Sequence, residues 1–393
     1  MLTFDEAIAV IDESIAPADQ LEEVPLSECL HRTLARAVIA DRPLPPFDRA
    51  TMDGFAVVAS DIQLGVTLPI DRTVSAGDAC AVEGKSGMCV SIATGASVPD
   101  GFDAVVKHES TRFIETEVEF LIDDVKPGTA IHPMGVDANA NDVLIEPNTL
   151  LKHHHIGIAA AVGATSLTVR KSIRLCVISS GDELVDGAET PKTHEIRNSN
   201  GPMLLALFES MGCVASSKMM ADDQGLTKAV LEEACSANDI VVTIGGISAG
   251  KKDFVIPALD ALSAHHIFKG VAMQPGKPCY VGTCQDAVVI GLPGNPVSAL
   301  VCATLFGKAV LRKMMGLNAT PKFSEVTLLN DVKPNPHREL FRPCVQELTG
   351  VTIPEWQGSG DLVHTTNTTG IVRIPKQVDI VASGTTVCYL PWS

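Results

Sequence analysis

The chain has 393 residues, more than one hydrophobic core usually organises, so two to four compact units are expected. Hydrophobic residues make up 46% of the chain and charged residues 20%, which is typical of a globular protein and not of a disordered one. The formal net charge of -17 argues against duplex nucleic acid as the main partner, because binding to its phosphates needs clustered Lys and Arg. If the ligand is nevertheless an anion, a bound cation, backbone N–H groups or a few lysines must offset the acidic surface.

The cysteines and the apolar segments indicate where the protein resides. The 11 cysteines include no CxxC pair, so we expect buried thiols and neither a zinc module nor a disulfide framework. The segment Met1 to Glu6 lacks the basic start of a secretory signal, which predicts a cytoplasmic protein. The uncharged stretch Ala287 to Gly307 is long enough to span a membrane, but turn residues Pro293 to Pro296 interrupt it. We therefore expect a buried strand, loop and helix there, and no membrane span.

The first half of the chain changes character twice. Phe4, Ala7, Ile8, Ile11 and Ile15 have helical spacing, and Leu21 to Val38 suggests a further strand and helix. Short apolar runs separated by Gly, Pro and Asp then predict a β-rich unit, including strands at Cys89 to Ile92, Ala104 to Val106 and Val118 to Ile122. Thr149 to Leu167 again has a helical pattern, so the β-rich unit is expected to be inserted into a discontinuous helical unit.

From Ile173 onwards, strands alternate with glycine-containing loops and helices. Three apolar strands, Arg174 to Ser179, Ile240 to Ile244 and Ala287 to Leu292, each precede such a loop, which predicts a parallel α/β sheet. In open sheets of this kind, ligands bind outside the carboxyl ends of the strands, so one crevice is expected to involve all three loops. After about Leu317, alternating Pro- and Thr-rich sequence predicts a small β domain.

Two loops have the composition of an anion site. Asn295 is a good helix N-cap, Pro296 suits the first helical position, and Ser298 follows in the first turn, so this helix N-terminus is expected to attract anions. A strand-to-helix turn without a ligand explains the same residues about equally well. The loop Pro275-Gly276-Lys277-Pro278 is stiff enough to hold the Lys277 ammonium in place, although a single lysine is more often a solvated surface residue.

Acidic residues in glycine-flanked loops suggest a magnesium site. Such loops contain Asp53, Asp137, Asp182, Glu183 and Asp253. Carboxylate oxygens suit Mg²⁺, which usually shares its coordination shell with substrate phosphates. For each acid alone, a turn cap or a solvated surface role is more common, and spacing does not show that the acids converge. These residues together favour an intracellular enzyme that processes a phosphate-bearing small molecule with the help of a metal.

The loops resemble the signature of the molybdopterin molybdenumtransferase family, the MoeA and gephyrin E-domain group. The longest matching segment is Pro45 to Val57, which contains Thr51-Met52-Asp53-Gly54. The resemblance covers essentially the whole chain and continues through Thr94 to Pro99, Ser180 to Leu184, Arg197 to Asn200, Gly245 to Ser248, Pro275 to Pro278 and Gly291 to Leu300.

The resemblance implies a multidomain α/β plus β fold, in an elongated, four-domain, MoeA-like subunit that forms a homodimer. Residues 1–44 and 137–170 would form a discontinuous helical linker and dimerisation domain. Residues 45–136 would form the inserted β-rich domain. Residues 171–318 would form the parallel α/β molybdopterin-binding domain, and residues 319–393 the C-terminal β domain.

The resemblance also implies an enzyme, a transferase of molybdenum cofactor biosynthesis. Family members insert molybdate into adenylylated molybdopterin, cleave its phosphoanhydride with Mg²⁺ and release AMP. Their partners would include the molybdopterin adenylyltransferase and the molybdoenzymes that accept the cofactor. By position, the catalytic residues would be Asp53, Asp137, Glu183, Asp253 and Lys277, of which Asp53, Glu183 and Asp253 would hold the metal. Substrate binding would involve Thr94, Gly95, Ser180, Asp182, Gly245, Gly246, Ser248, Pro275, Gly276, Pro293, Asn295, Pro296, Ser298, Arg342 and Ser359.

Several positions depart from the family pattern. Ser91 and Gln274 stand where basic residues are usual, His132 where arginine is common, Val136 replaces an acid beside Asp137, and Ile244 replaces a small hydroxyl residue. Lys251 and Lys252 stand where acids are frequent. Since a hydrogen bond to a charged group contributes about 1.5–3 kcal/mol, several such losses would weaken substrate binding by orders of magnitude. The alternatives are therefore a catalytically weakened paralogue that binds molybdopterin or anchors a partner, and an enzyme that adenylylates molybdopterin.

Overall fold

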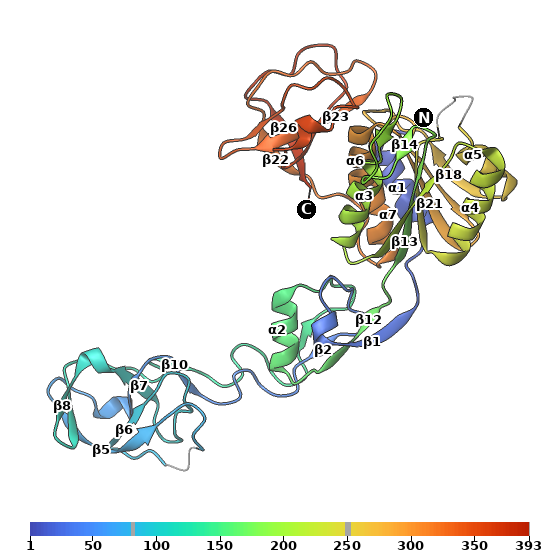
Figure 1. Cartoon of the computed structure of the whole chain (residues 1–393). Helices are drawn as coiled ribbons and strands as arrows, with labels where there is room; N and C mark the ends of the chain where they lie inside the picture. The colour runs from blue at the N-terminus through green and yellow to red at the C-terminus, as the bar shows by residue number, and fades with distance from the viewer. Residues whose placement is uncertain (80–82, 248–252, 393) are drawn as a thin grey trace. The chain divides into compact units, whose positions relative to one another are not determined.

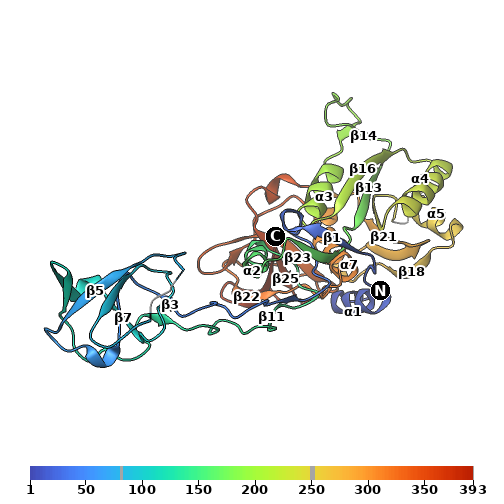
Figure 2. The same cartoon turned by 90° about the horizontal axis from the view of Figure 1, so that it is seen from below.

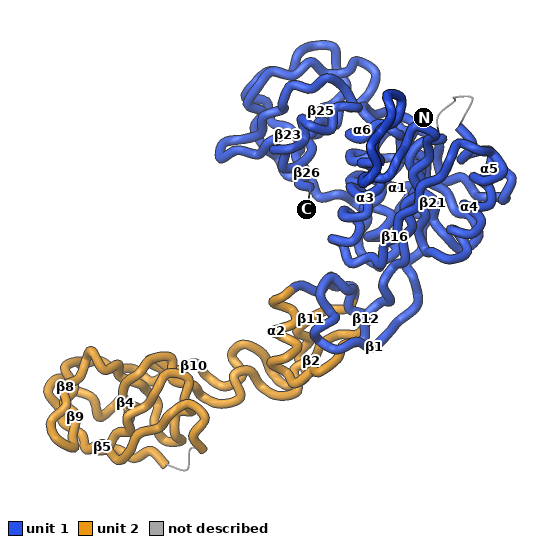
Figure 3. Tube along the Cα trace, viewed as in Figure 1, with its two compact units in different colours: residues 1–35, 148–152, 168–393 blue, residues 36–147, 153–167 orange. Residues whose placement is uncertain are grey.

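The computed structural model describes residues 1–79, 83–247 and 253–392. The chain divides into two compact units, which Figure 3 shows in two colours. Unit 1 comprises residues 1–35, 148–152 and 168–393, and unit 2 comprises residues 36–147 and 153–167. Unit 2 is thus inserted in the sequence of unit 1. No helix in the described part of the chain combines the length and apolar character that crossing a bilayer requires.

Unit 2 is built around a six-stranded sheet in the order β7-β4-β6-β5-β9-β8. Its strands are β4 (Gly54–Val57), β5 (Thr67–Val74), β6 (Cys89–Ile92), β7 (Ala104–Lys107), β8 (Thr111–Ile114) and β9 (Glu117–Phe120). The three strands predicted in this region are present as β6, β7 and β9. Phe55, Val106 and Phe120 lie in one hydrophobic cluster of this unit. Gly54 is required at the start of β4, because a Cβ there would lie 2.0 Å from the carbonyl oxygen of Val106.

Shorter elements complete unit 2. Two antiparallel pairs join β2 (Val38–Ile39) to β11 (Val143–Ile145) and β3 (Arg49–Ala50) to β10 (Ile131–His132). Helix α2 (His153–Ala161) follows, within the predicted helical segment Thr149 to Leu167. The 3₁₀ turns are η2 (Ala59–Asp61) and η3 (His108–Ser110).

The main sheet of unit 1 has six strands in the order β16-β13-β17-β21-β20-β18 (Figure 1). They are β13 (Arg174–Ser180), β16 (Val214–Met220), β17 (Ile240–Ile244), β18 (His265–Lys269), β20 (Tyr280–Cys284) and β21 (Ala287–Leu292). The predicted strands β13, β17 and β21 are parallel to one another, and so is β16. The sheet is mixed, however, because β20 and β18 are antiparallel. Only Gln285 and Asp286 separate β20 from β21, and so short a connection can form only a hairpin.

Helices cover both faces of this sheet. They are α3 (Asn200–Glu209), α4 (Gln224–Ala237), α5 (Val255–Ala261), α6 (Pro296–Cys302) and α7 (Lys308–Met314), with a π-helical turn η4 (Ala303–Gly307) between the last two. Alternate residues of β13 face opposite ways: Val177 lies in the core with α3 and α7, and Ile178 in the core with α4 and α5. Figure 2 accordingly shows α4 and α5 on one side of the strands and α3 on the other.

The N-terminal helix belongs to the same core. Helix α1 (Phe4–Ser14) begins with a capping box, in which the Thr3 side chain accepts from the Glu6 N–H and the Glu6 carboxylate accepts from the Thr3 N–H. Its predicted apolar face is buried in the cluster that also contains residues of β18 and α7. The helix expected within Leu21 to Val38 is absent from the structure. That segment forms β1 (Leu21–Pro25) and a 3₁₀ turn η1 (Leu26–Glu28), because backbone groups such as the Leu34 N–H bond to distant residues.

A second sheet forms the C-terminal part of unit 1, in the order β19-β23-β25-β26-β22 with β24 paired to β23. The strands are β19 (Met273–Gln274), β22 (Ser324–Thr327), β23 (Glu339–Gln346), β24 (Val351–Thr352), β25 (Gly370–Ile374) and β26 (Thr386–Pro391). β19 belongs by sequence to the α/β region, so its pairing with β23 connects the two parts of unit 1. Arg373 strengthens this connection, because its guanidinium bonds to Asp5 of α1 and to Glu339 at 2.7 Å each.

The burial of α1 yields the first prediction. Ile11 has 0% of its surface exposed, so Ile11→Ala should lower the free energy of unfolding of unit 1 by about 2–5 kcal/mol through lost burial and a residual cavity. Glu13→Ala, on the exposed face of the same helix, is the matched control and should change it by less than about 0.5 kcal/mol. Urea unfolding followed by tryptophan fluorescence measures both, since Trp356 and Trp392 lie in unit 1. Equal stability of the two variants would contradict the packing described.

Candidate functional site

The order of the parallel strands creates a crevice at one end of the main sheet. From β13 the chain passes through α3 to β16 on one side, and then through α4 to β17 on the other side of β13. The connections that leave the carboxyl ends of β13 and β17 therefore diverge. Such a switch point is where open α/β sheets bind ligands.

A cavity of about 70 Å³ lies at this switch point. Of the predicted site residues, it brings together Ser180 at the end of β13, Glu183 in the following loop and Pro296 at the start of α6. Gly294 also lines it. The loops after two of the three predicted strands, β13 and β21, thus contribute directly, and Ile244 at the end of β17 completes the wall.

Two glycines of the β17 loop allow it to approach β13. Gly245 has φ +87°, and a Cβ there would lie 3.1 Å from the carbonyl oxygen of Ser180. Gly246 has φ +67°, and its Cβ would lie 2.9 Å from a methyl carbon of Val255. Any side chain at these positions would adopt a disfavoured backbone conformation and press on its neighbours. Glycine is therefore required at Gly245 and Gly246 by the path of the β17 loop.

The acids after β13 have different surroundings. Asp182 accepts a hydrogen bond of 3.0 Å from the Asp222 N–H through its carboxylate, which fixes the loop. The Glu183 carboxylate folds over Gly181, where a Cβ would lie 2.7 Å from it. Two short strands, β14 (Leu184–Val185) and β15 (Ile196–Arg197), hold the far side of this loop. Of the described residues that line the cavity, Glu183 thus supplies the carboxylate.

Other predicted residues of the β17 loop lie elsewhere. Asp253 precedes α5 and is half-buried. Ser248, Lys251 and Lys252 lie outside the described residues. Asp253 therefore lies at the end of the β17 loop and is not among the described residues that line the cavity.

The loop before α6 is built differently from the prediction. Asn295 occupies the N-cap position, but its side chain makes no capping hydrogen bond and donates instead to Ser359 Oγ at 2.9 Å. The Ser359 carbonyl accepts from the Val297 N–H at 3.0 Å. We expected the N–H groups at this helix start to be open to an anion. The Val297 N–H is not open, because it already donates to the Ser359 carbonyl of the C-terminal part. Ser298 is 4% exposed, so it supports the loop through packing.

Pro275 and Gly276 set the backbone path of the loop that contains Lys277. Pro275 follows a cis peptide bond, and Gly276 has φ +99°. A Cβ on Gly276 would lie 2.2 Å from Cys302 Sγ, so only glycine fits. Both residues are buried, whereas Lys277 is exposed. Gln274 accepts a hydrogen bond of 2.5 Å from Asn335 Nδ2, so this departure from the family pattern helps to join the loop to the C-terminal sheet.

Arg342 and Ser359 belong to different environments. The Arg342 guanidinium carbon lies 3.9 Å from the centre of the Trp356 ring, and its Nη2 donates to the Pro354 carbonyl at 3.0 Å. Burial lowers the pKa of Arg342 to about 10, which leaves it a cation at neutral pH. It lines a separate cavity in the C-terminal part. Ser359, in contrast, contacts the loop before α6.

In unit 2, three predicted residues form one exposed turn. Asp53 Oδ1 accepts a hydrogen bond of 2.7 Å from the Thr94 N–H. This backbone bond, with a further contribution from the Thr94 side chain, lowers the pKa of Asp53, so its carboxylate is ionised at neutral pH. Gly95 has φ +84° and donates its N–H to the Ala50 carbonyl at 2.8 Å. The turn presents a fixed negative charge to solvent.

Asp137 lies apart from that turn. Its Oδ1 is 3.0 Å from His132 Nε2, so the histidine that stands in place of an arginine pairs with it. His132 is paired with Arg49, and Ile131 with Ala50, in the antiparallel register of β10 and β3. The chain therefore leaves this short ladder towards Asp53 at one end and towards Asp137 at the other.

The described residues contain no preformed cluster of three His, Cys, Asp or Glu side chains able to hold a metal. A magnesium ion does not require one, because it is commonly bound by one or two carboxylates together with substrate phosphates and water. Glu183 in unit 1 and Asp53 in unit 2 are carboxylates with that capacity.

Two residues of the cavity were missed by the sequence interpretation. Ser179 is 1% exposed, and its Oγ has no hydrogen-bond partner among the described residues. Asn200 donates from Nδ2 to the Gly294 carbonyl at 2.7 Å, but its buried Oδ1 is unpartnered. Buried polar atoms are nearly always hydrogen-bonded, so these two indicate a ligand or water in the cavity. The segment Arg197 to Asn200, which matched the family pattern, contained a signal for Asn200.

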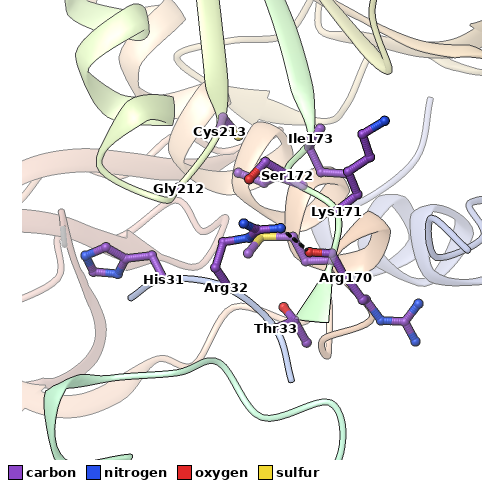
Figure 4. A pocket seen from close by; sticks show the side chains of 11 residues that line it. His31, Arg32, Thr33, Arg170, Lys171, Ser172, Ile173, Gly212 and Cys213 are labelled. Atoms are coloured by element: carbon purple, nitrogen blue, oxygen red, sulfur yellow. Dashed lines mark hydrogen bonds between the residues drawn. The ribbon is translucent and has the colours of Figure 1, made fainter. Parts of the chain in front are cut away.

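A further cavity in unit 1 is structural. Figure 4 shows it between the segments that contain Arg32 and Arg170, and its volume of about 10 Å³ is that of a single water molecule. Arg32 Nη2 donates to the Arg170 carbonyl at 2.7 Å, and Arg170 donates to the Ala18 carbonyl at 2.8 Å. Lys171 donates to Gln20 at 3.2 Å. These cations are thus used to connect segments of the chain.

The chain matches proteins of known family along most of its length. Residues 2–163 match the MoeA N-terminal region (domain I and II), and residues 176–313 match a probable molybdopterin binding domain. The molybdopterin molybdenumtransferase of Haemophilus influenzae is 31% identical over 334 residues, covering 84% of this chain and 82% of the relative. That of Staphylococcus aureus strain Mu50 is 32% identical over 328 residues, covering 81% of this chain and 78% of the relative.

Solved structures agree with these matches. The crystal structure of a molybdopterin biosynthesis MoeA protein from Pyrococcus horikoshii OT3 has a TM-score of 0.84 at 25% identity and covers 100% of both chains. A second structure of a MoeA protein from Pyrococcus horikoshii has a TM-score of 0.79 at 28% identity. The predicted multidomain α/β plus β fold is confirmed. The chain therefore belongs to the molybdopterin molybdenumtransferase family and is an enzyme of molybdenum cofactor biosynthesis.

Proposed function

We propose that this enzyme inserts molybdate into adenylylated molybdopterin, with magnesium-dependent cleavage of the phosphoanhydride and release of AMP. The observation that carries the proposal is the cavity at the ends of β13 and β17, where buried Ser179 Oγ and Asn200 Oδ1 lack partners next to the Glu183 carboxylate. A hydroxyl can donate to a phosphate oxygen, and an amide oxygen can accept from a pterin N–H or a ribose hydroxyl. The cavity thus offers both kinds of contact to such a substrate.

The predicted substrate-binding residues divide between contact and support. Ser180, Glu183 and Pro296 line the cavity and would contact the substrate directly. Gly245 and Gly246 would keep the wall narrow, and Asn295 and Ser359 would hold the loop before α6 in place. Thr94 and Gly95 would belong to the turn that holds Asp53 in unit 2. Ser248, Pro275, Gly276, Pro293, Ser298 and Arg342 stay predictions as substrate-binding residues, as does Asp182.

The acids would serve the hydrolytic step. A water oxygen attacks one phosphorus of the anhydride, the bridging P–O bond breaks, and a carboxylate accepts the proton that the water loses. Asp53 is suited to this role, since the Thr94 N–H keeps it ionised and fixed. Asp53, Glu183 and Asp253 stay predictions as Mg²⁺ ligands, and the bound ion would supply positive charge to the phosphate oxygens. Asp137 would act together with His132, and Lys277 would balance molybdate charge.

The setting of the reaction is proposed on the family resemblance alone. The enzyme would be a cytoplasmic homodimer that takes its substrate from the molybdopterin adenylyltransferase and passes the product to acceptor molybdoenzymes. A role purely as a scaffold is not favoured, because the relatives that match most of the chain are transferases.

A direct test of the proposed function supplies the purified protein with adenylylated molybdopterin, molybdate and Mg²⁺. Formation of AMP and active cofactor supports the proposal, and failure to form either overturns it.

The role of Asp53 can be separated from folding. Asp53→Asn keeps an oxygen that can accept from the Thr94 N–H but removes the negative charge, so AMP release should fall about a hundredfold or more while the melting temperature hardly changes. Asp142→Asn is the matched control, because Asp142 is also an exposed loop acid of unit 2 that accepts a backbone N–H, from Asn139 at 2.7 Å. Undiminished turnover of Asp53→Asn would remove Asp53 from the mechanism.

Magnesium dependence follows from the arrangement of acids. Because no described cluster of three ligands binds a metal by itself, Mg²⁺ should associate mainly with the bound substrate and be removed readily by a chelator. Excess EDTA should abolish AMP release, and added Mg²⁺ should restore it fully. Magnesium-saturated EDTA is the control. Full turnover with excess metal-free chelator would contradict the proposed use of the metal.

A further inference from the structure

Unit 1 contains a larger cavity that shares no lining residue with the cavity at the switch point. Its volume is about 450 Å³, within the range of small-molecule sites. Residues of η4 and α7 form one wall, the segment from Leu317 to Lys322 another, and the end of β26 a third. The family chemistry described above makes no use of this cavity.

The lining of this cavity has one sign of charge. It contains the basic residues Lys152, Lys308, Arg312 and Lys322, and none of its lining residues, all of which lie in the described ranges, is Asp or Glu. This contrasts with a chain whose formal net charge is -17. Most of the other lining residues are apolar, among them Leu317 and Leu390. The cavity is therefore suited to an anion that also has an apolar part.

Two of the cations are partly buried and lie close to each other in sequence. Burial, and secondarily Arg312, lower the pKa of Lys308, and burial lowers the pKa of Arg312. Lys308 Nζ donates to the Trp392 carbonyl, and Arg312 Nε donates to the Asn318 carbonyl at 2.8 Å. Both partners are neutral carbonyls. An anion in the cavity would stabilise both charges and reduce the repulsion between them.

A buried hydroxyl in the same wall is unpartnered. Thr304 is 1% exposed and lines the cavity, and its Oγ1 makes no hydrogen bond within the described part of the chain. It lies in η4, where the π-helical turn interrupts the regular bonding pattern, and such turns are frequent at functional sites. Thr304, Lys308 and Arg312 are spaced by four residues along one continuous helical segment, so they share a face. A hydroxyl and two cations thus line one side of the cavity.

We propose that this cavity binds a small phosphate monoester with an apolar substituent. The phosphate oxygens would accept hydrogen bonds from Thr304, Lys308 and Arg312, and the substituent would lie against Leu317 and Leu390. Lys322, which is exposed, would add long-range attraction. This binding site is separate from the cavity beside Ser179 and does not depend on the proposed reaction.

Isothermal titration with phenyl phosphate tests the proposal. Phenyl phosphate should bind the wild-type protein more tightly than benzoate, which has one negative charge, and more tightly than inorganic phosphate, which has no apolar part. Affinity should fall as the salt concentration rises. Phenyl phosphate can also enter the cavity at the switch point, so Ser179→Ala is titrated in parallel and should leave the proposed binding event unchanged.

Two variants test whether Thr304 and Lys322 take part in binding phenyl phosphate. Thr304→Val, which keeps the side-chain shape, should weaken phenyl phosphate binding about tenfold without lowering the melting temperature, because the hydroxyl has no partner to lose. Lys322→Gln should weaken it about twofold to fivefold. Lys228→Gln, an equally exposed lysine on α4, is the charge-matched control and should have no effect.

Three results would overturn the proposal. The first is wild-type affinity for phenyl phosphate in both Thr304→Val and Lys322→Gln. The second is no measurable binding by the wild-type protein. The third is an altered oligomeric state of the variants in sedimentation with unchanged anion binding, which would assign the cavity to an interface between copies of the chain.

Discussion

The close approach of the β17 loop to the end of β13 is the constraint on which the candidate site depends. Gly245 and Gly246 both have positive φ, and a Cβ on Gly245 would lie 3.1 Å from Ser180. Because β16 and β17 lie on opposite sides of β13, the neighbouring connections diverge and leave a space. Ser179 and Asn200 border that space with unpartnered polar atoms, which a substrate can satisfy.

The C-terminal part of unit 1 contributes to the same loops through backbone as well as side-chain contacts. Ser359 accepts from the Val297 N–H and from Asn295, so the loop before α6 is closed by a segment more than sixty residues further along the chain. Gln274 bonds to Asn335 in a similar way. A substitution at Ser359 or Asn335 can therefore disturb loops of the α/β part from a distance along the chain. The cationic cavity beside α7 lies at another junction of the same two parts, since both α7 and the end of β26 line it.

Sequence alone predicted the elements that have a strong period or a local signal. The apolar face of α1, the parallel strands β13, β17 and β21, and the loop around Gly276 were all predictable from spacing, turn residues or glycine and proline. The hairpin that makes the sheet mixed was missed. The hydrogen bond from the Val297 N–H at the start of α6 to the Ser359 carbonyl was also missed, because a bond between residues 62 positions apart leaves no local pattern in the sequence. Ser179 was missed because, in the sequence, a serine with an unpartnered hydroxyl in a buried strand cannot be distinguished from any other small core residue.

The central claim is that the cavity beside Ser179 binds the phosphate-bearing substrate. Its most direct measurement is the equilibrium affinity for adenylylated molybdopterin of the wild type, Ser179→Ala, Asn200→Ala and, as a control on α4, Ser236→Ala. A lost hydrogen bond to a charged phosphate should weaken binding by Ser179→Ala about tenfold. The free energy of unfolding of Ser179→Ala should not fall below that of the wild type, because the Ser179 hydroxyl has no partner in the free protein. Asn200→Ala should also bind more weakly, and Ser236→Ala should bind as the wild type does. Wild-type affinity in both cavity variants would contradict the account.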